Sequence, residues 1–185
     1  MGMGNKELNE RMKLTNYIMN NKSVLEEWSG KTFNRVLYDS DNDDKKASTF
    51  REKIMNHGQL YFIVFDYNNN VFGHYYPGVI NKTERLFSDV DTFIFTVNSN
   101  GRCGMKKFNS KGKSTWTFIY DGEDYGYYSF GCKNEVRYEA LNFKEKSRIF
   151  GYGMVELFEG VGKDTLTGSN DHEYSVRKLL IIEMK

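Results

Sequence analysis

Residues 60–76 read Leu60-Tyr-Phe-Ile-Val-Phe65, Asp66-Tyr-Asn-Asn-Asn70 and Val71-Phe-Gly-His-Tyr-Tyr76, and this stretch decides the fold. Its first six residues are all apolar or aromatic and leave no polar face, which is typical of a strand covered on both sides. Asp and Asn tolerate positive φ and hydrogen-bond their own backbone, so residues 66–70 predict a turn. A second strand over residues 71–76 would then complete an antiparallel β-hairpin.

Other segments rich in β-branched and aromatic residues predict further strands, separated by turns of Gly, Asn and Asp. They are Phe33 to Asp39, Thr92 to Val97, Thr115 to Tyr120, Tyr125 to Phe130, Tyr152 to Phe158 and Lys178 to Met184. No helix alternates with them as a parallel sheet would require. The sequence therefore predicts an α+β fold, a two-sheet antiparallel β-sandwich flanked by short helices.

Helical periodicity is confined to three short segments. Residues 5–20 predict one helix, a second ends near Trp28, and a third places Ala47, Phe50 and Ile54 on one face. We interpret residues 1–30 as a helical extension and residues 31–185 as the sandwich domain. The extension is expected either to pack on a sheet or to form a seam with a partner or a second copy.

Composition narrows the class of protein. The chain has 185 residues, a net charge of +1 and 16% aromatic residues, which suits one folded domain with no global attraction to nucleic acid or an anionic membrane. No apolar run approaches the roughly 20 residues of a membrane span, and the first residues lack the apolar region of a signal peptide. The two cysteines, Cys103 and Cys132, form no disulfide framework. We therefore expect an intracellular, cytoplasmic protein.

The densest charge is the run Asp39-Ser-Asp41-Asn-Asp43-Asp44. A calcium-binding EF-hand needs Gly at loop position 6 and Glu at position 12. Started at Asp39, the run has Asp44 and Phe50 at those places, and started at Asp41 it has lysines at positions 5 and 6. We expect no Ca²⁺ site and no cofactor, and interpret the acids as capping the positive end of the helix that follows.

A family resemblance adds to this interpretation. Val36-Leu-Tyr-Asp-Ser40, the Ala47-Ser-Thr-Phe50 helix start, Val71-Phe-Gly-His-Tyr75 and Asp91-Thr-Phe-Ile-Phe95 follow one another as in the TLDc domain, the family of the oxidation-resistance proteins. The resemblance is closest over residues 31 to about 100. It implies a β-sandwich flanked by helices, and identifies residues 31–185 as a TLDc-like domain.

The resemblance also implies a function. Characterised TLDc proteins protect cells against oxidative stress, and several bind the peripheral head of the vacuolar proton-pumping ATPase (V-ATPase) and modulate its assembly. We therefore expect a non-enzymatic protein-interaction module, cytoplasmic, reaching vesicle membranes through its partner, with the nucleus left open. Loops of a rigid sandwich are the natural place for recognition. The candidate partner-binding residues are Asp39, Asp41, Asp43, Tyr76 and Tyr127.

Two other functions stay open. A thiol- or peroxide-handling enzyme would use Cys103, whose neighbour Arg102 could favour the thiolate. A nucleic-acid-binding stress or transcription regulator would use the basic stretch from Arg102 to Lys113, with Phe108 stacking on bases. The histidines at 57, 74 and 172 show no metal-ligand spacing, and a histidine inside an aromatic strand is more often packed and hydrogen-bonded.

Overall fold

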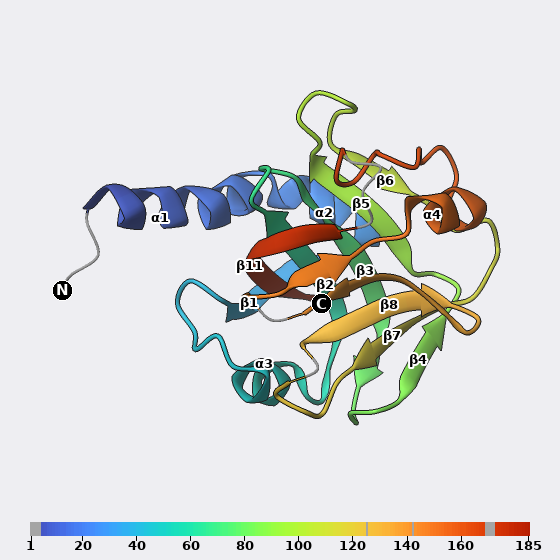
Figure 1. Cartoon of the computed structure of the whole chain (residues 1–185), viewed down its shortest axis with the longest axis horizontal. Coiled ribbons are helices and arrows are strands. Elements are labelled where there is room, and N and C mark those ends of the chain that lie inside the picture. The colour runs from blue at the N-terminus through green and yellow to red at the C-terminus, as the bar shows by residue number, and fades with distance from the viewer. Residues whose placement is uncertain (1–4, 125, 142, 169–172) are drawn as a thin grey trace.

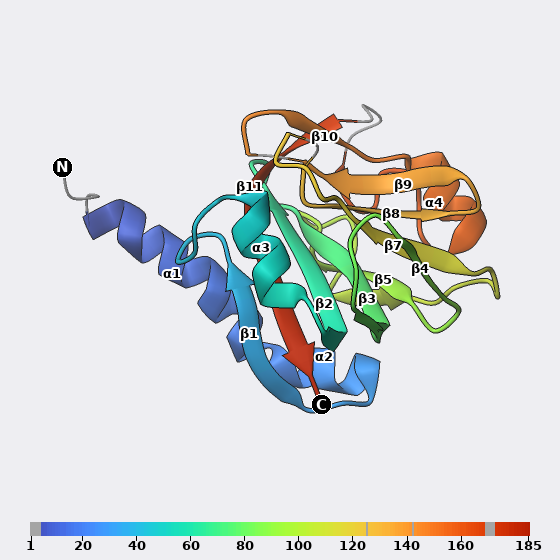
Figure 2. The ribbon, with the colours of Figure 1, turned by 90° about the horizontal axis from the view of Figure 1, so that it is seen from below.

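Two antiparallel sheets packed face to face form the body of the structure (Figures 1 and 2). The structure is a computed structural model that describes residues 5–124, 126–141, 143–168 and 173–185, with side chains from residue 13 onward. The larger sheet has the order β1-β11-β2-β3-β5-β6, with β10 paired to β11, and the smaller has the order β4-β7-β8-β9. The predicted α+β sandwich is confirmed.

The described residues form four helices, α1 (Asn5–Asn20), α2 (Lys22–Ser29), α3 (Ala47–Ile54) and α4 (Gly151–Leu157). The strands are β1 (Phe33–Asp39), β2 (His57–Asp66), β3 (Val71–Ile80), β4 (Leu86–Asp89), β5 (Phe93–Asn98), β6 (Lys106–Phe108), β7 (Thr115–Ile119), β8 (Tyr128–Cys132), β9 (Glu135–Ala140), β10 (Lys146–Arg148) and β11 (Glu173–Met184). Within this part of the chain, no helix is both long and apolar enough to cross a membrane.

The predicted hairpin is present. β2 and β3 pair antiparallel from Phe65 opposite Val71 back to His57 opposite Ile80. Asp66 organises the turn, because its carboxylate accepts hydrogen bonds at 2.8 Å from the backbone N–H groups of Asn68 and Asn70. Asn69 takes a positive φ of 64°, as Asn in a tight turn can.

Strand β2 is buried on both faces, as its composition predicts. Leu60, Phe62 and Val64 face the core between the two sheets. The alternate residues, Tyr61, Ile63 and Phe65, face a second apolar core on the outer side of the larger sheet. Strand β2 therefore contributes to both cores. It is hydrogen-bonded to β11 along one edge and to β3 along the other.

Helices α1 and α2 cover the outer face of the larger sheet, and the amino-terminal half of α1 extends beyond the sandwich in both views (Figures 1 and 2). Ile18 and Leu25 are buried against the sheet, and the Tyr61 hydroxyl donates a hydrogen bond of 2.7 Å to the Leu25 carbonyl. Gly30 ends α2 in a left-handed conformation with φ of 67°. The carboxyl-terminal half of the extension thus packs on the sheet; a domain boundary at residue 30 stays a prediction.

Helix α4 corrects one predicted strand, since residues 152–158 were expected to be extended. Met154 and Leu157, three residues apart, are buried, whereas Tyr152 and Val155 are 65% and 37% exposed. This spacing fits one face of a helix and not the alternation of a strand. Short apolar segments do not distinguish the two by period alone, so the prediction was wrong.

His74 lies at the centre of the core between the sheets and is packed and hydrogen-bonded, as expected. Its ring stacks between Phe62 and Phe130, with ring centroids 4.6 and 4.5 Å away. Its Nδ1 shares a hydrogen bond with the Tyr138 hydroxyl, and its Nε2 lies 2.9 Å from Thr117 Oγ1. Burial lowers the pKa of His74 to about 3, so the ring is neutral in the folded protein at physiological pH.

His74 predicts a specific loss of stability in acid. Between its ordinary pKa of 6.5 and its folded pKa of about 3, the unfolded chain binds a proton that the folded chain does not. Stability is therefore lost as pH falls through this window, with a contribution of about 1.4 kcal/mol per pH unit from His74. Urea unfolding of the wild type and of His74→Gln from pH 7 to pH 4 should show a slope smaller by about that amount in the variant. Equal slopes in the two proteins would contradict the assignment.

Candidate functional site

The five residues predicted to form an exposed docking patch do not form one. Asp39, Tyr76 and Tyr127 are buried, with 4%, 5% and 2% of their surface exposed. The side chains of Asp41 and Asp43 are 10% and 19% exposed. The expectation of exposure is therefore wrong, and the reason differs between the acids and the tyrosines.

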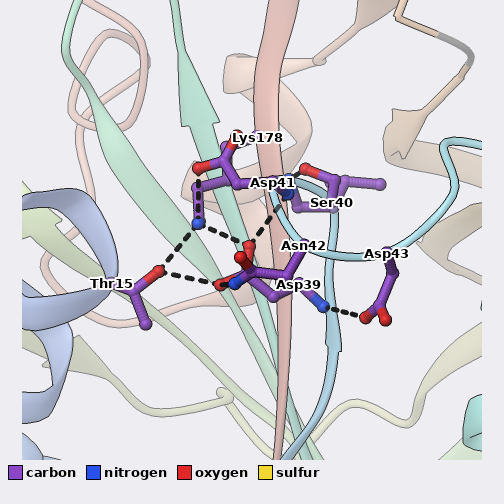
Figure 3. A network of polar contacts seen from close by, with 8 residues as sticks. Thr15, Asp39, Ser40, Asp41, Asn42, Asp43 and Lys178 are labelled. Carbon is purple, nitrogen blue, oxygen red and sulfur yellow. Dashed lines mark hydrogen bonds and ion pairs between the residues drawn. The ribbon is translucent and has the colours of Figure 1, made fainter. Parts of the chain in front are cut away.

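The acids turn inward because they face a buried lysine (Figure 3). Lys178, on β11, is completely buried. Its Nζ donates hydrogen bonds to Asp39 Oδ1 at 2.5 Å, to Asp41 Oδ2 at 2.7 Å and to Thr15 Oγ1 at 2.7 Å. Burying an ammonium group is tolerable only when charge and hydrogen bonds are supplied around it, and here all three donors are used. One side chain thus holds together α1, the segment after β1 and β11.

The rest of the acidic segment is tied to itself. Asp39 Oδ2 accepts hydrogen bonds from Thr15 Oγ1 at 2.9 Å and from Asn42 Nδ2 at 3.1 Å. Asp43 accepts one from the Asp39 backbone N–H at 2.8 Å and pairs with Lys53 of α3 at 2.7 Å. This segment therefore has a fixed shape in which Asp39 and Asp43 serve the fold.

The amino terminus of α3 is capped from elsewhere in the chain. The acidic run was expected to cap it, but no acidic residue lies in the first turn and Lys46 at the N-cap makes no side-chain bond. Glu123 does so instead, accepting hydrogen bonds from the backbone N–H groups of Ala47 at 3.0 Å and Ser48 at 2.7 Å. Burial alone raises the pKa of Glu123, but the bonds from Ser48 and Ala47 and the charge of Arg51 outweigh it and lower the pKa.

The two tyrosines are packed as core residues. Tyr127 makes an edge contact with Phe50 of α3, with ring centroids 5.3 Å apart. Tyr76 lies against Phe87 of β4, with centroids 6.1 Å apart. Both rings join the core between the sheets, so neither is available as an anchor for a partner.

The structure nevertheless brings the acidic run and the segment around Glu123 together at α3. Glu123 binds the start of the helix, and the Tyr38 hydroxyl bonds to the Asp44 carbonyl at 3.2 Å. Exposed side chains gather along these two segments. We call these exposed residues the α3 rim. They are Asn42, Asp44, Lys45, Lys46, Asp121, Glu123 and Asp124. Acids outnumber lysines in this set, and the ordered backbone beneath them is fixed by Lys178 and Glu123.

In the thiol site expected at Cys103 and the nucleic-acid site expected at residues 102–113, several of the named side chains are engaged within the fold. Arg102 donates hydrogen bonds to Asn70 Oδ1 at 2.6 Å and to the Leu166 carbonyl at 3.3 Å, whereas the half-buried Cys103 sulfur accepts one from Ser99 at 3.4 Å. Phe108, the expected base-stacking residue, is 1% exposed.

The lysines of the basic stretch are also engaged. Lys107 Nζ lies 4.2 Å from the centroid of Phe93 and donates a hydrogen bond of 2.9 Å to the Trp28 carbonyl. Lys111 Nζ bonds the Val155 carbonyl at 2.7 Å. This stretch therefore holds α2 and α4 against the sheet.

Two open cavities flank the helices that cover the larger sheet. One of about 400 Å³ lies beneath α1 and is lined by apolar groups of Leu14, Tyr17 and Phe65. The other, about 530 Å³, lies at the end of α2 and contains Lys107, whose pKa is lowered by burial. Among the residues described, no three His, Cys, Asp or Glu side chains are arranged to hold a metal ion, and His172 lies outside those residues.

Sequence reasoning missed Lys178, Thr15 and Glu123. Lys178 did carry a signal, because it directly precedes the apolar run from Leu179 to Ile182 in a chain with a dense acidic cluster. Glu123 carried none, since its contact with Ser48 spans 75 positions and depends on the packed fold.

These features define an antiparallel β-sandwich domain in which amino-terminal helices cover the outer face of the larger sheet and the buried Lys178 is paired with acids of the segment at the end of β1. The sequence matches the TLDc domain family over residues 9–170, and the chain belongs to that family. The match begins within α1, so it includes the two helices that cover the larger sheet. No individual curated protein matches the chain.

The Lys178 network predicts a large effect of one substitution. Lys178→Met would remove the ammonium group that binds both Asp39 and Asp41, and breaking a buried ion pair costs about 3–5 kcal/mol. The matched control is Lys146→Met, because Lys146 pairs with Glu173 on the surface, with side chains 65% and 56% exposed. Surface pairs contribute about 0–1 kcal/mol. Chemical denaturation of both variants measures the difference; similar losses would contradict the role given to Lys178.

The Glu123 cap predicts a smaller, local effect. Glu123→Ala removes the acceptor for two backbone N–H groups of α3 and should lower the free energy of unfolding by about 1 kcal/mol. Asp124→Ala, at the next residue, which is also exposed, should change the free energy of unfolding by less than about 0.5 kcal/mol. Hydrogen exchange of the Ala47 and Ser48 amides should increase only in the first variant.

Proposed function

We propose that this protein is a TLDc-type protein-interaction module that acts in the oxidative-stress response by docking on the peripheral head of the vacuolar proton-pumping ATPase. Membership of the TLDc family is the observation that carries the proposal. The activity proposed is binding without catalysis. Its expected location is the cytoplasm, with vesicle membranes reached through the ATPase.

The α3 rim is the surface we assign to this docking. Its charged side chains are exposed, its acids outnumber its lysines, and its backbone is held in place by the Lys178 and Glu123 contacts. A preformed loop loses little conformational entropy on binding, and exposed charge mainly accelerates encounter with an oppositely charged patch. The rim replaces the originally predicted set, whose tyrosines and Asp39 are buried.

The test compares two charge-reversed proteins with the same change in net charge. Asp44→Lys with Asp124→Lys alters the rim, whereas Glu156→Lys with Glu159→Lys alters exposed acids on and after α4. We expect the rim variant to associate with the purified ATPase head about tenfold more slowly, with a weaker dependence on salt and a nearly unchanged dissociation rate. The α4 variant should bind like the wild type.

Surface plasmon resonance with the head purified from the same cell measures these rates, and an assembly assay shows whether binding promotes or reverses attachment of the head to its membrane sector. Equal effects of the two variants would contradict the assignment to the rim. Failure of the wild-type protein to bind the head would remove the ATPase as the partner.

A further inference from the structure

Strand β4 is an open edge of the sandwich. It is the terminal strand of the smaller sheet, paired only with β7, from Leu86 opposite Phe118 to Asp89 opposite Thr115 (Figure 1). Within the described part of the chain, Leu86–Asp89 make no backbone–backbone hydrogen bond beyond their pairing with β7. An unpaired edge presents a row of N–H and C=O groups that a further strand can satisfy.

The other end of the same sheet is closed. The backbone of β9 is bridged at Tyr138 by Ile149, and the Phe150 N–H donates a hydrogen bond of 2.8 Å to the Arg137 carbonyl. In the larger sheet, the segment directly after the end strand β6 is bonded to the end of α4, with the Lys111 N–H donating to the Leu157 carbonyl at 2.8 Å and the Glu159 N–H donating to the Asn109 carbonyl at 2.9 Å. Of the two ends of the smaller sheet, β4 is therefore the open one.

The charged residues at the two ends of β4 are opposite in sign, so two antiparallel copies of the strand are complementary in charge. Arg85 precedes β4 and is exposed, and Asp89 ends it, its Oδ1 accepting a hydrogen bond of 2.6 Å from the Asp91 backbone N–H. If two copies of β4 pair antiparallel about an axis at Phe87, Arg85 of each copy lies directly opposite Asp89 of the other. Both cross-strand pairs then join opposite charges, the arrangement that stabilises neighbouring strands.

The apolar surface is complementary in the same register. Leu86 is 48% exposed, and beside it a groove of about 360 Å³ is lined by Leu86, Ser88 and Trp116, with Cys132 and two lysines at its rim. Ser88 lies opposite Trp116 in β7. In the pairing centred on Phe87, Leu86 of the second copy lies opposite Ser88 and so covers this groove.

We propose that β4 pairs with β4 of a second copy of this chain, antiparallel and centred on Phe87, so that the two smaller sheets join into one. A two-fold axis makes the contact isologous, with each copy giving and receiving the same Arg85 and Asp89 pair. Because the strand is short, the dimer is weak and concentration-dependent, with a dissociation constant of about micromolar order.

The test is a charge swap measured by sedimentation equilibrium from about 1 to about 500 µM protein. Arg85→Asp and Asp89→Arg each place like charges opposite one another twice and should weaken the dimer about tenfold or more. The double variant, Arg85→Asp with Asp89→Arg, restores both pairs and should recover dimerisation, a rescue that misfolding cannot produce. Glu156→Arg on α4 is the control for a change in charge alone.

A wild-type protein that is monomeric over the whole range would overturn the proposal. So would a dimer that both single variants leave unchanged, because it would use another surface. Loss in the single variants without recovery in the double variant would also reject the register centred on Phe87. Far-ultraviolet circular dichroism of each variant establishes that the fold is retained before its association is compared.

Discussion

Burial of β2 on both faces is the constraint on which the rest of the structure depends. Six consecutive apolar residues cannot present a face to water, so each side of the larger sheet needs a covering layer. The smaller sheet, with α3 and α4 beside it, supplies one layer, and α1 with α2 supplies the other. The amino-terminal helices are thus required by Tyr61, Ile63 and Phe65, whose side chains would otherwise be exposed.

The same constraint explains the polar network. The last strand, β11, lies between β1 and β2 in the interior of the larger sheet, so a charged residue in its buried middle part must be accommodated inside the protein. Lys178 is such a residue, and its ammonium is accommodated because Asp39, Asp41 and Thr15 surround it. The acidic run after β1 is therefore understandable as the counter-charge of a strand 139 positions later.

The sequence predicted what local pattern determines. The turn at Asp66–Asn70, the two-sided strand before it and the sandwich class all follow from residues that act on their immediate neighbours, and each is confirmed. Segments with weak periodicity were less predictable: α4 was mistaken for a strand because a seven-residue apolar segment fits both periods. Long-range pairing was not accessible, and charge density alone could not distinguish acids bound to Lys178 from acids free to meet a partner.

The difference between acids bound within the fold and acids exposed to solvent limits which of them a partner could contact. Asp39 is saturated by four hydrogen-bond donors and Asp43 holds Lys53, so a partner that engaged either would have to break bonds the fold needs. Asp44 follows Asp43 on the same segment and Asp124 follows Glu123, and both carry the same charge and are exposed. The buried carboxylates fix the backbone, and the neighbouring acids remain exposed to water. Such a charged surface loses little conformational entropy on binding. In the docking that we propose, the buried acids would contribute through the rigidity of the loop, and the exposed acids through their charge.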